Sequence, residues 1–145
     1  MKAGELMTSE PAFCTPDDTI QKAAELMRDC DCGCIPVVEG KDKKRLVGLV
    51  TDRDLAVRAL AQGKSADTPV KDVMSSQLCC CHSDDDVSAV EAIMVKEQVR
   101  RVPVVDDDGC CVGMISQADL ALNAAAATDS EIGKVVERIS EPSHA

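Results

Sequence analysis

Aromatic side chains are almost absent from this chain of 145 residues: Phe13 is the only one, and there is no Trp or Tyr. Hydrophobic residues still make up 45% of the chain, so the core must be built from aliphatic side chains and cysteine. Positive charge is also scarce, because 16 Lys and Arg face 26 Asp and Glu, for a formal net charge of -10. Such a chain repels polyphosphate, which argues against non-specific nucleic-acid binding.

Long hydrophobic runs are missing as well. No stretch approaches the roughly 18 apolar residues of a membrane span, and the first residues lack the apolar run of a signal peptide. We therefore expect a cytoplasmic protein with no membrane partner. Nine cysteines, an odd number without an export signal, then favour reduced thiols over a disulfide framework. The length fits one compact domain or two half-domains, not a large multidomain enzyme.

The chain contains an internal repeat. Shifting the sequence by 67 positions lays residues 5–38 over residues 72–105 without a gap, with nine of the 34 pairs identical. The first copy then carries two extra residues, after which Gly48–Leu55 aligns with Gly113–Leu120 at an offset of 65. An insertion of this kind belongs in a surface loop. We divide the chain into copy one (1–65), copy two (66–128) and a C-terminal segment (129–145).

Each copy has the same predicted order of elements. Residues 15–18 and 82–86 supply a capping hydroxyl and early acids, and helical spacing of apolar residues follows from Ile20 and from Val87. Two short β-branched runs then predict paired strands, and a second helix begins near Thr51 and near Ser116. With lead-in strands near 12–14 and 79–81, the fold class is α/β, strand-helix-strand-strand-helix twice. An amphipathic pattern predicts a further helix over residues 129–140.

A motif at the end of the last strand of each copy carries the strongest chemical signal: glycine, two apolar residues, Thr or Ser, two variable residues, Asp and Leu. Gly48 and Gly113 lack a Cβ, so a flat ligand could approach the strand closely. Thr51 and Ser116 stand where a helix begins, which is a natural anion site. Asp54 and Asp119 could accept hydrogen bonds from a vicinal diol. The alternative for each residue alone is structural: a helix cap for the hydroxyl and a dipole-favoured acid for the aspartate.

The duplicated motif, the Met7 and Met74 lead-ins and the two Ile/Val-Pro-Val-Val strands resemble a tandem pair of CBS motifs, the Bateman module, of the small stand-alone bacterial type. The resemblance covers residues 5 to about 127. It implies two copies related by a pseudo-twofold axis, with clefts that bind AMP, ADP, ATP or a related adenosyl ligand. It also implies a non-catalytic sensor that needs no cofactor, forms a homodimer and passes its signal to an effector protein that the sequence does not name.

The resemblance further implies which residues bind the nucleotide. Ribose maps onto the two motif aspartates and phosphate onto the two motif hydroxyls, with basic residues reaching over the cleft; Arg53 of copy one is replaced by Ala118 in copy two. The complete set of predicted site residues is Thr51, Arg53, Asp54, Ser116, Asp119, Cys34, Ile35, Pro36, Val37, Arg100, Arg101, Val102 and Pro103, of which the strand residues would form the adenine slot.

Two other functions remain open at this point. The Cys30-x-Cys32-x-Cys34 spacing could place thiols on one face of a strand, so a cysteine-based metal or redox protein on the same fold is one alternative. A dimerisation module with degenerate sites is the other. Catalysis is not predicted, because no nucleophile is paired with a base and the two motif aspartates belong to separate sites.

Overall fold

The computed structural model describes residues 1–123, so the helix predicted over 129–140 lies outside the described residues. The described chain divides into two compact units. The first contains Met1–Ser9, Cys79–Asp107 and residues 112–123, and the second contains Glu10–Leu78 and Asp108–Cys111. Each unit is therefore built mostly from one copy of the repeat, together with the first residues of the other copy.

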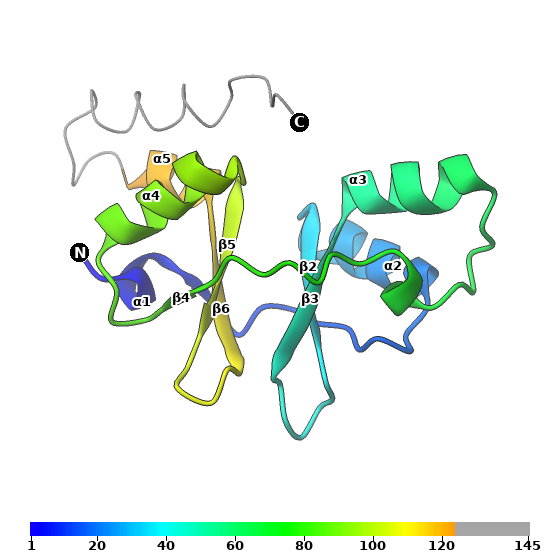
Figure 1. Cartoon of the computed structure of the whole chain (residues 1–145), viewed down its shortest axis with the longest axis horizontal. Helices are drawn as coiled ribbons and strands as arrows, with labels where there is room; N and C mark the ends of the chain where they lie inside the picture. The colour runs from blue at the N-terminus through cyan, green and yellow to red at the C-terminus, as the bar shows by residue number, and fades with distance from the viewer. Residues whose placement is uncertain (124–145) are drawn as a thin grey trace. The chain divides into compact units, whose positions relative to one another are not determined.

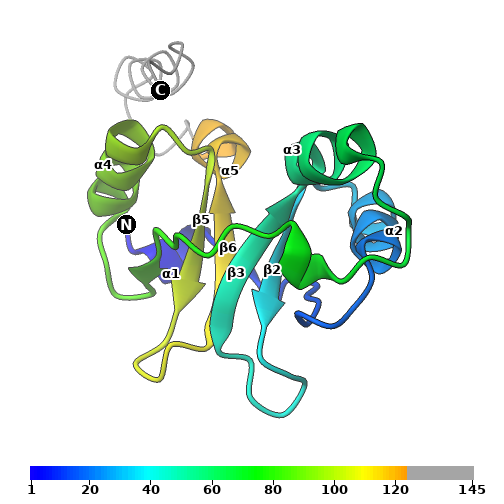
Figure 2. The ribbon, with the colours of Figure 1, turned by 45° about the vertical axis from the view of Figure 1, so that its right-hand side comes forward.

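The second unit holds copy one. Its lead-in residue Cys14 forms a parallel bridge with Val37, and α2 (Ile20–Cys30), β2 (Cys34–Val38) and β3 (Leu46–Thr51) follow. A helical segment then runs through α3 (Asp52–Asp54), the π-helical turn η1 (Leu55–Ala59) and the 3-10 turn η2 (Leu60–Gln62), and η3 (Val70–Asp72) comes later. Strands β2 and β3 pair antiparallel, with α2 and the α3 segment lying together beside them (Figure 1 and Figure 2).

The first unit holds copy two in the same order. After α1 (Ala3–Leu6) and β1 (Thr8–Ser9), its elements are β4 (Cys81–His82), α4 (Val87–Glu97), β5 (Arg101–Val105), β6 (Cys111–Ser116) and α5 (Gln117–Leu122). The sheet order is β1-β6-β5-β4, and β4 runs parallel to β5 with Cys81 opposite Val104. This matches the Cys14 and Val37 pairing of copy one. The predicted strand-helix-strand-strand-helix order is confirmed in both copies.

Local sequence explains where the first helices begin. Helix α2 is capped by Thr19, whose hydroxyl accepts a hydrogen bond from the Lys22 amide at 3.1 Å, so the expectation of a cap within residues 15–18 was wrong. In that segment Asp18 instead accepts a hydrogen bond from the Thr15 amide at 2.7 Å, which closes the preceding turn. Asp85 does the same for the His82 amide at 2.8 Å, which accounts for the identical aspartate in both copies.

Each unit has its own aliphatic core. One cluster gathers α1, β4, α4, β5, β6 and α5; the other gathers α2, β2, β3, η1 and η3. Strand β2 is buried along its whole length, whereas β3 alternates between buried and half-buried positions. None of the helices formed by residues 1–123 is both long and apolar enough to cross a membrane.

The two motif glycines are required by a methionine, which corrects the expectation that their missing Cβ leaves room for a ligand. Met74 lies over Gly48, where a Cβ would come within 2.7 Å of its Sδ and within 2.9 Å of the Ser75 carbonyl oxygen. Met7 lies over Gly113 in the same way, and a Cβ there would be 2.8 Å from the Met7 Cγ. Real Cβ atoms do not approach so closely, so glycine lets each lead-in segment reach the sheet.

This packing gives a stability prediction. Gly113→Ala should lower the free energy of unfolding by about 1–3 kcal/mol, because the added methyl group overpacks against Met7. Gly40→Ala is the matched control, since a Cβ there would meet nothing within 4 Å, and its effect should stay within about 0.5 kcal/mol. Urea unfolding followed by circular dichroism measures both. The loss from Gly113→Ala should shrink in a Met7→Ala background; an undiminished loss would show that methionine is not the obstacle.

Candidate functional site

The motif residues of each copy form a capping box at the start of the second helix. In copy one the Thr51 hydroxyl accepts from the Asp54 amide at 3.1 Å, and the Asp54 Oδ2 accepts from the Thr51 amide at 3.0 Å. In copy two Ser116 and Asp119 form the same pair of bonds at 3.2 and 2.8 Å. The structural alternative weighed for these residues is therefore realised: each hydroxyl caps a helix and each aspartate completes the cap.

Capping leaves part of each aspartate available to a ligand. A carboxylate offers about four lone-pair positions, and the box uses one oxygen of Asp54. The Asp54 side chain is only 13% exposed, so the carboxylate is held in place rather than free in solvent. Its Oδ1 lies 3.7 Å from the Arg58 Nε, which is longer than a hydrogen bond. Asp54 can therefore still accept from a hydroxyl group while it caps the helix.

The structure brings the strand start and the motif of copy one together. Cys34 is the register partner of Thr51, and the Gly33 carbonyl accepts from the Asp52 amide at 2.9 Å. In copy two the Arg100 carbonyl accepts from the Gln117 amide at 2.8 Å, so Arg100 and the adjoining Arg101 lie at the helix start beside Ser116. These predicted site residues are neighbours within each copy. The cations of copy two come from the strand side.

The strand residues predicted to form the adenine slot belong to the core. Ile35 and Val37 are 1% and 0% exposed, and Pro36 is also fully buried. Val102 is completely buried, and Pro103 is buried within β5. A ligand at these strands would meet main-chain atoms and the strand starts rather than these side chains. Arg53 is exposed; its amide bonds to the Asp52 Oδ1 at 2.9 Å.

The ion pair between Arg58 and Asp54 was not anticipated from the sequence. The signal was present, because residues four apart on a helix face each other and an acid four positions before a base favours such a pair. The spacing of Asp54 and Arg58 fits that rule. The motif ends one residue after the aspartate, so it does not include Arg58.

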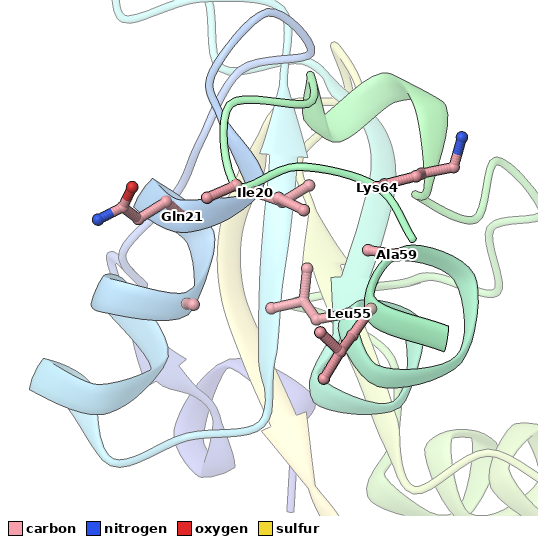
Figure 3. Close-up of a pocket in the computed structure, with 8 residues that line it drawn as sticks. Ile20, Gln21, Leu55, Ala59 and Lys64 are labelled. Atoms are coloured by element: carbon pink, nitrogen blue, oxygen red, sulfur yellow. The ribbon is translucent and has the colours of Figure 1, made fainter. Parts of the chain in front are cut away.

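A cavity of about 290 Å³ lies elsewhere in the second unit, between α2 and the helical segment after α3. Ile20, Leu55 and Ala59 converge on it, while Gln21 and Lys64 direct their polar ends outward (Figure 3). The walls are apolar, and they do not include Thr51 or Asp54. Leu60, also in the lining, is 78% exposed.

The cysteine run does not gather as its spacing suggested. Cys30 ends α2, Cys32 lies in the following turn and only Cys34 belongs to a strand, so the expectation of thiols on one face of a strand was wrong. Cys30 and Cys32 are exposed, whereas Cys34 is buried. Within residues 1–123 no group of three or more His, Cys, Asp or Glu side chains is placed to hold a metal ion.

Family comparison decides the identity of the repeat. The CBS domain model matches residues 3–60 and again residues 70–125. The chain belongs to the CBS domain family. The CBS domain-containing protein YhcV of Bacillus subtilis (strain 168) is 40% identical over 119 residues, covering 82% of each chain.

Solved CBS structures share the fold. The CBS domain pair of protein MJ0100, solved in complex with 5′-methylthioadenosine and S-adenosyl-L-methionine, is 25% identical with a TM-score of 0.77, covering 87% of this chain and 97% of that one. Hypoxic Response Protein I, solved with two coordinated zinc ions, is 28% identical with a TM-score of 0.76, covering 84% of this chain and 98% of that one.

Burial determines the chemistry of the cysteine that the two CBS copies share. Cys14 and Cys81 are buried at equivalent positions. Burial raises the pKa of the Cys14 thiol from 9.0 to about 12, and the nearby Asp18 carboxylate acts in the same direction. Burial likewise raises the pKa of Cys81 to about 11, with a contribution from Asp85. These thiols are core residues that stay protonated at neutral pH.

The raised values predict a loss of stability in alkali. Between pH 9 and the folded pKa values, the unfolded chain has released the two thiol protons while the folded chain keeps them, so stability falls as the pH rises. The urea midpoint should therefore drop from pH 8 to pH 10 under reducing conditions. The drop should be smaller in Cys14→Ala with Cys81→Ala, and unaltered in Cys30→Ala, whose thiol is exposed. Equal slopes in all three proteins would contradict the assignment.

Proposed function

We propose that this CBS pair is a non-catalytic regulatory module that binds an adenine nucleotide or related adenosyl ligand at each capping-box motif. The observation that carries the proposal is the identical arrangement in both copies: a part-buried aspartate, a hydroxyl and a helix start, all at the end of one strand. A ribose diol matches the remaining acceptor positions of the aspartate, and a phosphate matches the helix start with its neighbouring arginines.

The predicted residues take distinct roles in this proposal. Asp54 and Asp119 accept from the ribose, and Thr51 and Ser116 face the phosphate. Cys34 and Arg101, at the strand starts, border the adenine together with the main chain of their strands, and Arg53 and Arg100 supply positive charge. The MJ0100 pair, which holds adenosyl ligands, supports this class of ligand through its similar fold. The ligand acts as a regulator, and no cofactor is needed.

Removing the carboxylates tests this function. Asp54→Ala should weaken one of two binding events for AMP or ATP in titration calorimetry, and Asp54→Ala with Asp119→Ala should weaken both. Loss of a buried hydrogen-bond acceptor costs about 1–3 kcal/mol, or roughly 5- to 150-fold in affinity. Because each aspartate also caps a helix, circular dichroism must show that the variants are folded. Unchanged affinity in the folded double variant would falsify the site assignment.

We also propose that the module acts as a cytoplasmic homodimer that signals through a separate effector. Leu60 lines the apolar cavity and is 78% exposed, and Val57 in the preceding helical turn is 45% exposed. A second copy of the chain would cover these apolar side chains. The exposed thiols of Cys30, Cys32 and Cys80 suit a reducing compartment.

Light scattering at micromolar concentration should therefore give twice the chain mass of 15.4 kDa. Leu60→Lys should shift the population toward the monomer, because it places a charge in the apolar contact. Gln62→Lys adds the same charge to the same exposed turn and serves as the control. A monomeric parent protein, or an equal effect of the two variants, would rule out this interface.

A cysteine-based metal protein is the second candidate, favoured by the two zinc ions in the Hypoxic Response Protein I structure. The placement of Cys30, Cys32 and Cys34 on a helix end, a turn and a strand gives it less support in this chain. Native mass spectrometry of gently purified protein separates the two candidates, since bound nucleotide and bound zinc have different masses.

A further inference from the structure

The ion pair of Arg58 with Asp54 has an anchored member and an exposed one. The Asp54 carboxylate is 13% exposed and is fixed through its Oδ2 by the Thr51 amide. The Arg58 side chain is 56% exposed, and its Nε lies 3.7 Å from the Asp54 Oδ1. A contact of this length between a held carboxylate and a solvated arginine is weak. The guanidinium can therefore change position when a ligand occupies the Oδ1 side of Asp54, while the carboxylate stays in place.

Arg58 also balances the charge of the copy-one motif. The first turn after Thr51 carries Asp52, Arg53 and Asp54, which sum to one negative charge. The strand start beside it contributes Gly33 and Cys34, which are neutral. With Arg58 the sum is zero, and without it the motif is negative in a chain whose net charge is already -10. A negative motif would disfavour any ligand that carries phosphate.

Copy two has no arginine at the corresponding position. The offset of 65 places Asn123 there, and its amide donates to the Asp119 carbonyl at 3.0 Å, closing the end of α5. Among the ion pairs formed by residues 1–123, none involves Asp119. The positive charges beside the copy-two motif are Arg100 and Arg101, which stand at the strand start where copy one has Gly33 and Cys34. Each copy thus has compensating cations, supplied by the helix in copy one and by the strand in copy two.

We propose that Arg58 is the residue that makes the copy-one site accept phosphorylated adenine ligands, by offsetting the charge of Asp54 and offering a cation to the ligand. The inference rests on the proposed function and adds a specificity determinant to it. Arg58 is expected to matter little for neutral adenosine, which needs only the acceptor on Asp54. Arg58 should contribute to the affinity for ADP, because the negative charge of ADP lies close to the Asp54 carboxylate.

The experiment isolates the copy-one site in an Asp119→Ala background and compares ADP with adenosine by titration calorimetry. Arg58→Asn introduces the residue that copy two has. It should raise the Kd for ADP about tenfold, as expected for losing a charge-assisted contact, while the Kd for adenosine changes by less than about twofold. Arg58→Lys should retain most of the ADP affinity. The ADP effect should shrink at high salt, because Arg58 is exposed and its field is screened.

Arg45→Asn is the matched control. Arg45 is also an exposed arginine of the second unit in a long carboxylate pair, with Glu39 at 3.8 Å, and its loss changes the net charge equally. If Arg45→Asn and Arg58→Asn weaken ADP alike, or if Arg58→Asn weakens ADP and adenosine by one factor, the role of Arg58 is overturned while the proposed function stands. If the folded parent binds neither ligand, both proposals are overturned.

Discussion

The close approach of a methionine to a glycine is the contact on which each half of this fold depends. Thr8 and Ser9, near the start of copy one, pair with β6 of copy two, and Ser75, near the start of copy two, bridges to Leu49 of copy one. Met7 and Met74 lie at these same places, against Gly113 and Gly48. Neither repeat therefore completes its own sheet. Each sheet is completed by a segment of the other copy, and this pairing requires both methionines and both glycines. This requirement explains why all four positions recur in the duplication.

The same contact changes how the motif is understood. The glycine is required by packing, and the hydroxyl and aspartate are required by the capping box, so every fixed position of the motif has a structural reason to exist in both copies. In-register duplication alone does not then distinguish a ligand site from a helix start. What favours a ligand is the geometry left over: a carboxylate that is held rigidly, uses one oxygen for the cap and has acceptor capacity remaining beside a strand start.

Sequence reasoning succeeded where the determinants are local. The helical spacing after Ile20 and Val87 corresponds to α2 and α4. The helix boundary was misplaced because Thr15 and Thr19 both offer a hydroxyl; Thr15 belongs to the turn that Asp18 closes, and Thr19 caps the helix. The pairing of Thr8 and Ser9 with β6 could not be predicted, because a two-residue strand carries no periodicity and its partner lies about a hundred residues away. The prediction that Cys30, Cys32 and Cys34 share one face of a strand was wrong because a helix ends at Cys30, before the strand begins at Cys34.

The two copies share the capped aspartate but differ in where the positive charges around it stand. Both hold an aspartate by the same pair of hydrogen bonds, yet one has an arginine a turn further along the helix and the other has asparagine there and arginines on the strand. Moving a cation from one element to another leaves the cap, the core and the sheet undisturbed, because each of these arginines is at least partly exposed. Ligand charge is thus a property that a duplicated fold can vary in one copy without altering the other. Under the proposed function, the two sites of a single scaffold could then favour adenine ligands with different numbers of phosphates.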